Sequence, residues 1–470
     1  MSLTGGAQVP DFRQPSFHGL IGISREEITP PIGIYARNWA ASDHDIADEV
    51  HRPLTATAMT LQTARNAEPL VLISLDLGWW RRKEDEWFLR GHLIEQLNID
   101  QARVIIALTH THSGPSISLG DTDKPGGNVV RPYLQLVRDN LVRIVREAIR
   151  DAVPATLAWT YGRCRLAKNR DQFVPELGKY VNGYDEKSPA DPVLLVGKIV
   201  SDEGKTLGTV VNYACHPTSI GWESRVISPD YVGAMRELVE ANAGGLCLFL
   251  QGAAGEMAPR DQFSNDLEVA DRNGRELGYA VLSALESMVQ PGFRATQSRL
   301  VESGSSLGIW KHEPDKVSSA MEATIHTVEV PLKPMPTVAD IEKKIALADD
   351  REMIERLRRE REVRHTVGNE ETVRFPIWLW AAGDTLILGC PAEPYTLLQR
   401  HLRLHFLDRA VCVINVANGW FGYLPPRELY DKEVPTVHQT PFAKGSLEFL
   451  IHGSLGQFER LCKANPTLVS

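Results

Sequence analysis

The chain has 470 residues, of which 43% are hydrophobic and 24% are charged, a composition typical of a globular protein. Its formal net charge of -9 leaves no basic surplus to neutralise a phosphate backbone, so we expect no nucleic acid among its partners. No run of about 18 apolar residues is present, so no transmembrane segment is expected.

The amino terminus and the cysteines bear on the cellular compartment. Met1 to Pro10 lack the basic-then-apolar pattern of a signal peptide, although a leader removed before this start stays possible. The six cysteines are scattered without a CxxC pair and favour buried free thiols, which suit a reducing compartment. We therefore expect a cytoplasmic protein; the sequence contains no information on its oligomeric state.

Short apolar runs bounded by turn residues recur through the first 260 positions and alternate with helical patterns. Runs that are apolar throughout predict strands buried on both faces, and the alternation predicts an α/β fold with mixed sheets flanked by helices. The expected strands are Leu70–Leu75, Val104–Leu108, Val193–Val200, Leu207–Tyr213 and Leu246–Leu250. The expected helices are Tyr133–Ala152, Tyr231–Ala241 and Val269–Met288.

The second half begins with a charged stretch. Ile341–Arg364 is rich in Glu, Arg and Lys and predicts an exposed helix or helical hairpin, an insertion near 336–366. Strand patterns resume at Phe375–Ala381, Thr385–Leu388 and Ala410–Val416, with a helix at Pro394–Phe406. We expect one domain over 1–470, with its catalytic part at about 18–430 and segment 431–470 packed on it.

The strongest local motif is Thr109-His110-Thr111-His112-Ser113-Gly114-Pro115, directly after a predicted strand. Two histidines at spacing two share one face of a strand, and HisXHis is a common spacing for zinc ligands. The end of a strand is also where α/β proteins build their sites. The alternative is a pair of loop histidines bonded to the backbone.

A second histidine motif, Asn212 to Ser219, also ends a predicted strand. Pro217 keeps His216 out of helical geometry, so we expect its imidazole at the rim of the sheet. A lone histidine there is more often structural, but two such motifs together favour a shared metal. The neighbouring Cys215 points to the opposite face of the strand and is expected in the core.

Three further candidates carry weaker evidence. The turn Gln251 to Arg260 is rich in small residues and has Glu256 as its carboxylate; the alternative is a tight turn without chemistry. Trp79 to Lys83 could bind an anion and is interpreted as the rim of a pocket. His401 and His405 lie four apart on a helix but among arginines, which favours a solvated face.

These motifs together resemble the neutral/alkaline ceramidases. The resemblance runs from about residue 20 to about residue 430, is dense only in 100–260, and is specific in the order of its motifs. The matching segments are Thr109–Pro115, Asn169-Arg170, Asp191-Pro192, Asn212–Ser219, Pro229–Met235 and Gln251–Pro259.

Members of that family are zinc amidases that release a fatty acid from ceramide. The resemblance implies a zinc ion held by His110, His216, Glu393 and Tyr423, with His112 and Arg170 lining the pocket. A carboxylate and a phenol among the ligands suit an open catalytic site better than a closed structural one.

The chain also departs from the family pattern. The position of the family's serine nucleophile is Ala258, and a further pocket tyrosine is replaced by Pro435 or its neighbours. The family's carboxy-terminal immunoglobulin-like domain and its secretory leader are expected to be absent. We therefore expect the fold and the metal site to be retained, but not the ceramide-specific machinery.

The simplest chemistry is a zinc-dependent hydrolase in which a metal-bound hydroxide attacks an amide, ester or lactone. Glu256 or His112 would shuttle the proton, and Arg170 would hold a substrate carboxylate or the oxyanion. The expected partner is a small-molecule or lipid-like amide or ester. The rival interpretation is a catalytically inactive ceramidase-like protein that binds a metal or ligand.

Overall fold

The computed structural model describes residues 11–464 and consists of two large sheets with helices on their outer faces. The expectation about a leader rests on residues 1–10, which lie outside the described part. None of the helices within residues 11–464 has the length and apolarity of a membrane span.

The larger sheet has eight strands, and only its two edge pairs are parallel, β11 with β13 and β5 with β6. In sheet order the strands are β13 (Leu246–Gln251), β11 (Thr206–Tyr213), β10 (Val193–Ser201), β7 (Val153–Arg163), β2 (Ser16–Glu27), β4 (Thr55–Gln62), β5 (Leu70–Leu75) and β6 (Val104–Leu108).

The second sheet has four strands and packs face to face against the first. Its order is β17 (Met321–Pro331), β18 (Thr372–Ala382), β19 (Thr385–Gly389) and β21 (Ala410–Ile414). The shared core contains Phe17, Leu72 and Ile105 from the first sheet and Trp380 and Cys412 from the second. Close packing of these apolar faces holds the sheets together.

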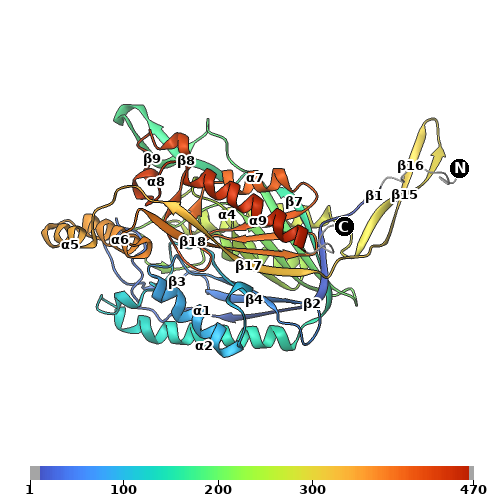
Figure 1. Cartoon of the computed structure of the whole chain (residues 1–470), viewed down its shortest axis with the longest axis horizontal. Helices are drawn as coiled ribbons and strands as arrows, with labels where there is room; N and C mark the ends of the chain where they lie inside the picture. The colour runs from blue at the N-terminus through green and yellow to red at the C-terminus, as the bar shows by residue number, and fades with distance from the viewer. Residues whose placement is uncertain (1–10, 465–470) are drawn as a thin grey trace.

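Helices cover both outer faces, so the layers run helix, sheet, sheet, helix (Figure 1). The large sheet carries α1 (Lys83–Leu97), α2 (Val130–Arg150), α3 (Tyr231–Ala243) and α4 (Leu267–Glu286). The four-stranded sheet is covered by α6 (Arg351–Val367), α7 (Leu397–His405) and α9 (Ser446–Ala464). Strand β5 shows why the runs are apolar: Ile73 faces α2 and Leu72 faces the other sheet.

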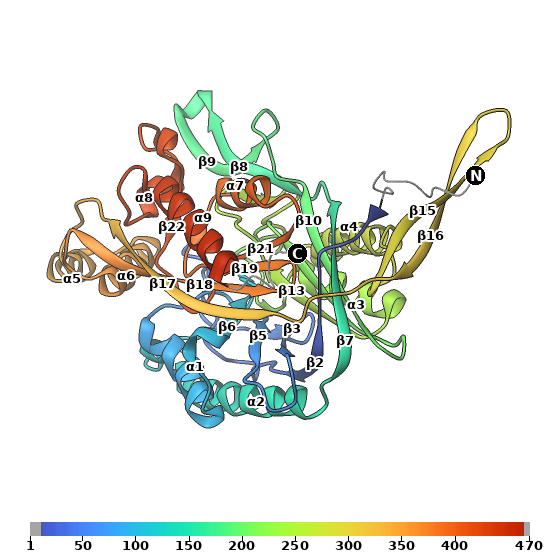
Figure 2. The same ribbon diagram turned by 45° about the vertical axis from the view of Figure 1, so that its right-hand side comes forward.

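Smaller strands complete the fold. The hairpin of β15 (Phe293–Glu302) and β16 (Ser306–Pro314), with β1 (Asp11–Phe12), projects from the layered body (Figures 1 and 2). The other small sheets are β14 (Met257–Pro259) with β8 (Ala167–Val174) and β9 (Lys179–Asp185), β12 (Val226–Ile227) with β3 (Glu49–Val50), and β20 (Glu393–Pro394) with β22 (Tyr423–Leu424). A short helix, α8 (Pro435–Gln439), precedes α9.

The predicted α/β class with mixed sheets is confirmed, and the charged insertion is a helical hairpin of α5 (Val338–Leu347) and α6. The expectation that this hairpin is exposed is wrong for α6. Leu357, Val363 and Val367 of α6 are buried, and Glu355 is buried with them. The charged composition of this segment does not indicate that burial, because the buried carboxylates are paired with arginines from other segments.

All six cysteines are free and buried, as expected. Cys215 lies in the apolar core between the large sheet and helices α3 and α4, so it is not available as an exposed nucleophile.

Candidate active site

The chain leaves β6 at Leu108, and His110 adopts a left-handed backbone conformation with φ of 72°. The prediction that His110 and His112 share one face of a regular strand is therefore wrong, because the strand geometry has already ended. The two rings nevertheless lie close together, with centroids 5.1 Å apart. The turn is held by the His110 amide, which donates to the Leu77 carbonyl at 2.9 Å.

Backbone carbonyls orient the rings of His110 and His216. His110 Nδ1 lies 3.0 Å from the Gly78 carbonyl oxygen, and His216 Nδ1 lies 3.0 Å from that of Met257. A carbonyl oxygen only accepts, so each Nδ1 carries a proton that it donates. In a neutral ring the lone pair is then on Nε2, which in both residues faces the same point.

That point is occupied by the carboxylate of Glu393. Its Oε2 lies 3.2 Å from His110 Nε2 and 2.9 Å from His216 Nε2, while its Oε1 accepts from Trp420 Nε1 at 2.7 Å. Glu393 is in β20, which pairs in parallel with β22 so that Glu393 is the register partner of Tyr423. All three acid and imidazole side chains are at least 98% buried.

Burial sets the charges of this cluster. It lowers the pKa of His216 to about 4, aided by the nearby Arg170 guanidinium. Burial also raises the pKa of Glu393, but His110 and His216 outweigh it and hold that pKa well below its usual value. The carboxylate is therefore ionised, and His216 is neutral at pH 7.

His112 completes a group of three histidines whose ring nitrogens lie within 4.8 Å of one another. Neither of its ring nitrogens has a hydrogen-bond partner among the described residues, although both are shielded from solvent. Burial lowers its pKa well below the usual value, with a further contribution from His110. Unpartnered buried nitrogens are costly, so His112 is poised toward a ligand rather than toward the protein.

Two donor sets could hold a divalent cation. The first is His110, His216 and Glu393, whose side chains the structure brings together, with Tyr423 next to them. The second is the three histidines. The Tyr423 ring stacks 6.4 Å from His216, and its hydroxyl accepts from Arg170 Nη2 at 3.3 Å. Burial raises the pKa of Tyr423, and Glu393 raises it further.

Arg170 is buried beside the cluster and is held from two sides. Its Nε and Nη2 donate to the Gly255 carbonyl at 3.2 and 2.8 Å, and its backbone amide donates to the Glu256 carbonyl. The guanidinium thus lies between the glycine turn and Tyr423.

The structure does not bring the Glu256 carboxylate to the imidazoles. Both of its oxygens accept from the Thr396 amide at 3.0 Å, and one also accepts from the Thr396 hydroxyl. Thr396 is the residue before α7, so Glu256 anchors the start of that helix. Burial raises the pKa of Glu256 to about 8 in spite of the Thr396 hydrogen bonds.

Ala258, which the resemblance aligns with the serine nucleophile, is in β14 opposite Lys168 of β8 and is buried. Its methyl group offers no nucleophile.

Several aromatic residues that the motifs did not predict surround His112. Trp39 and Trp79 have ring centroids 4.7 and 5.0 Å from it, and Phe263 lies 5.5 Å from Trp39. Only Trp79 had a sequence indication, as part of a possible pocket rim. Trp39 and Phe263 reach the site from distant segments, which no local pattern reports.

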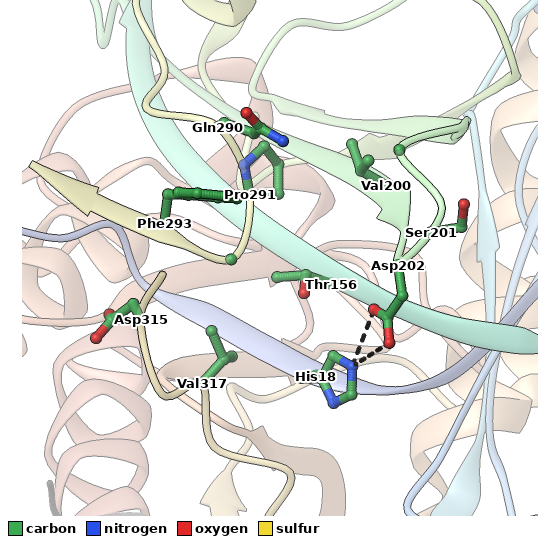
Figure 3. A pocket seen from close by; sticks show the side chains of 12 residues that line it. His18, Thr156, Val200, Ser201, Asp202, Gln290, Pro291, Phe293, Asp315 and Val317 are labelled. Carbon is green, nitrogen blue, oxygen red and sulfur yellow. Dashed lines mark hydrogen bonds and ion pairs between the residues drawn. The ribbon is translucent and has the colours of Figure 1, made fainter. Parts of the chain in front are cut away.

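A cavity of about 340 Å³ lies elsewhere, between the base of the β15–β16 hairpin and the large sheet (Figure 3). His18 Nε2 is 3.1 Å from Asp202 Oδ1 at its wall, and both side chains are substantially exposed. On β10, Val200 at this cavity pairs with Thr206, while Leu194 pairs with Tyr213 near His216. The cavity and the histidines therefore lie at opposite ends of the large sheet.

The fold and the buried cluster define a class: a mixed α/β protein with a buried histidine group that could bind a metal. The relative that defines this class is neutral ceramidase from Pseudomonas aeruginosa, to which the chain is 25% identical over 283 residues. That match covers 55% of this chain and 38% of the relative's length, and no family model matches the chain.

Solved structures agree with the sequence match. The crystal structure of neutral ceramidase from Pseudomonas aeruginosa superposes with a TM-score of 0.65 over 96% of this chain and 75% of that one, at 16% identity. A ceramidase structure described as complexed with C2 gives the same score over 94% of this chain and 74% of that one. The chain is thus a homologue of neutral ceramidase and shares its fold.

Proposed function

We propose that the protein is a zinc-dependent hydrolase of amide or ester bonds, in which His110, His216 and Glu393 hold the ion with Tyr423 beside them. The observation that carries this proposal is the single carboxylate oxygen of Glu393 within 3.2 Å of two imidazole nitrogens.

The donor chemistry fits a cation. Each Nδ1 donates to a carbonyl, so each ring, when it carries no second proton, presents its Nε2 lone pair to the same ionised carboxylate oxygen. This contact is repulsive unless a proton or a cation lies between the groups, and burial makes a proton on His216 costly. Imidazole nitrogen and carboxylate oxygen are ligands that zinc accepts, and the carbonyl bonds fix the rings as metal-binding histidines require.

A bound zinc ion would lower the pKa of a coordinated water and polarise the scissile carbonyl. The chain itself supplies no acyl-accepting hydroxyl at the family's serine position, because that residue is Ala258. Water is therefore the nucleophile that we assign.

We assign the proton transfer to His112. Its ring is neutral at pH 7 and has no protein partner at either nitrogen, so it can take a proton from the attacking water. It then returns that proton to the leaving amine or alcohol. Glu256 is not assigned this role, because its carboxylate is used at the start of α7.

Arg170 and Tyr423 form the pair that we assign to the developing oxyanion. The guanidinium stays charged, since burial, which lowers its pKa, is outweighed by Tyr423. A buried, preoriented cation stabilises a negative oxygen without reorganisation. The Tyr423 hydroxyl accepts from Arg170, so its own proton points away from Arg170 and can be donated to the oxyanion.

The test is zinc analysis of the purified protein, followed by a panel of amides and esters that includes ceramide. We expect stoichiometric zinc and hydrolysis of an amide, both lost in His110→Ala. A zinc-containing protein that hydrolyses none of the panel would favour the rival ligand-binding function. Ala258→Ser separates the routes: unchanged activity supports attack by water, whereas new ceramidase activity indicates a scaffold that lost its nucleophile.

A further inference from the structure

Four arginines share two carboxylates in the part of the chain that contains Trp39 and helix α6. Arg81 and Arg359 pair with Glu355 at 3.7 and 3.1 Å, and Arg37 and Arg351 pair with Asp45 at 3.9 and 2.6 Å. Among the ion pairs of this group, positive charge is in excess. Arg37 and Arg81 are largely buried, with 5% and 11% of their side chains exposed, so this surplus of positive charge favours a bound anion.

Two of these arginines lie on the tryptophan that contacts the histidines. The guanidinium carbons of Arg81 and Arg359 are 4.4 and 5.3 Å from the centre of the Trp79 ring. The same ring is 5.0 Å from His112 and 5.8 Å from His110. Arg359 is near enough to His112 to lower the pKa of that imidazole. The surplus charge therefore lies next to the reacting centre.

Two nitrogens of the Arg359 guanidinium are held by hydrogen bonds, and the third is available to a ligand. Its Nε donates to Glu355 at 3.1 Å and its Nη2 donates to the Asn38 carbonyl at 2.8 Å. Its Nη1 makes no hydrogen bond to any residue of the described chain, and 26% of the side chain stays accessible. Asn38 in turn donates to the Gly114 carbonyl in the histidine loop, which ties α6 to that loop.

A second observation points to a ligand at this place. Neither nitrogen of His112 has a partner, and the indole nitrogen of Trp39, whose ring contacts His112, is also buried without one. The edge of Arg359 at Nη1 and the unbonded ring nitrogens of His112 and Trp39 thus belong to one cluster of contacting side chains, which Trp79 connects. A carboxylate matches such an edge, because its two oxygens accept in parallel from a guanidinium.

We propose that Arg359, supported by Arg81 on Trp79, binds the carboxylate of an anionic substrate, so that the preferred substrate class is N-acylated amino acids rather than neutral amino-alcohol amides such as ceramide. This inference rests on the proposed hydrolase function for its kinetic part, but not for its binding part. The sequence alone suggested anion binding only for the stretch Trp79 to Lys83. The second guanidinium comes from the distant helix α6.

The test compares lauroylglycine with lauroylethanolamine, which share an acyl chain and an amide and differ in the carboxylate. On the zinc-loaded chain we expect a kcat/KM higher for lauroylglycine by roughly 10- to 100-fold. Arg359→Gln should lower kcat/KM for lauroylglycine by roughly 10- to 100-fold and so bring the kcat/KM values of the two amides close together. Equal turnover of both amides by the wild type, or a preference that survives Arg359→Gln, would overturn the proposal.

The matched control is Arg356→Gln, because Arg356 is on the same helix but is 64% exposed and pairs with Glu352 one turn away. Arg356→Gln should keep the preference in full. Circular dichroism and thermal unfolding of both variants show whether helix α6 is intact. Arg359→Lys keeps the charge but loses the fork, so a partial preference is expected.

Calorimetric titration of lauroylglycine into metal-free protein separates this inference from the hydrolase proposal. We expect binding that weakens roughly 10- to 100-fold in Arg359→Gln and also weakens with added salt. Binding of this kind without turnover would support the anion site and contradict the hydrolase. Turnover of both amides without Arg359-dependent binding would do the reverse.

Discussion

The two ends of the eight-stranded sheet each carry a histidine and a carboxylate, but in opposite surroundings. At one end His18 and Asp202 are 40% and 55% exposed beside a cavity of about 340 Å³. At the other end His110 and His216 contact Glu393 with 2% or less of any side chain exposed. An exposed pair is screened by water and contributes little, whereas buried unpaired polar groups carry a large penalty. The candidate active site is therefore identified by the burial of its polar side chains and by their mutual contacts, and not by the size of a cavity.

Removing one histidine from each end of the eight-stranded sheet tests this comparison most strongly. His110→Ala should lower kcat/KM by more than about 1,000-fold, because the ion loses a ligand and the Glu393 carboxylate loses a neighbour. His18→Ala, the matched control at the exposed end, should leave kcat/KM within about two-fold of the wild type. Comparable losses in both variants would mean that the buried cluster has no special role.

A second, smaller effect separates the third histidine from the other two. His112→Gln should lower kcat by about 100- to 10,000-fold, the usual contribution of a general base, while the zinc content stays at the wild-type level. Zinc is measured by mass spectrometry on the same sample used for kinetics. Loss of the metal in this variant would instead assign His112 to the donor set of three histidines.

A still smaller effect concerns Glu256, whose pKa is raised to about 8 by burial. An acid with a raised pKa in the folded state stabilises the fold below its ordinary pKa and loses that contribution as the pH rises toward 8. The free energy of unfolding of the wild type should therefore fall by about 2 kcal/mol more than that of Glu256→Gln between pH 6 and 9. Denaturant titrations at the two values measure this difference, and parallel curves would refute the assignment.

Sequence reasoning worked best where burial acts on both faces of an element. Strands β5 and β6 are apolar throughout because one face packs on helices and the other on the second sheet, and their predicted bounds are confirmed. Strand β2 was missed because polar and glycine residues interrupt it, and helix α1 because its charged residues are spread over the segment. Local composition does not report contacts that arise only on folding.

The same limit applies to the site. The histidines follow strands in recognisable motifs, but Glu393 and Tyr423 were predicted only through the family resemblance. Trp39 and Arg359 were not predicted at all, because their place beside His112 depends on segments far apart in the chain. Arg359 in particular is part of a helix whose composition indicated a solvated surface.

The central claim is that His110, His216 and Glu393 hold a divalent cation, and diffraction at the zinc absorption edge tests it most directly. Crystals grown with zinc should give one anomalous peak about 2.0 to 2.2 Å from both Nε2 atoms and from a Glu393 oxygen. An absent peak, with Glu393 Oε2 still in direct contact with both imidazoles, would contradict the account.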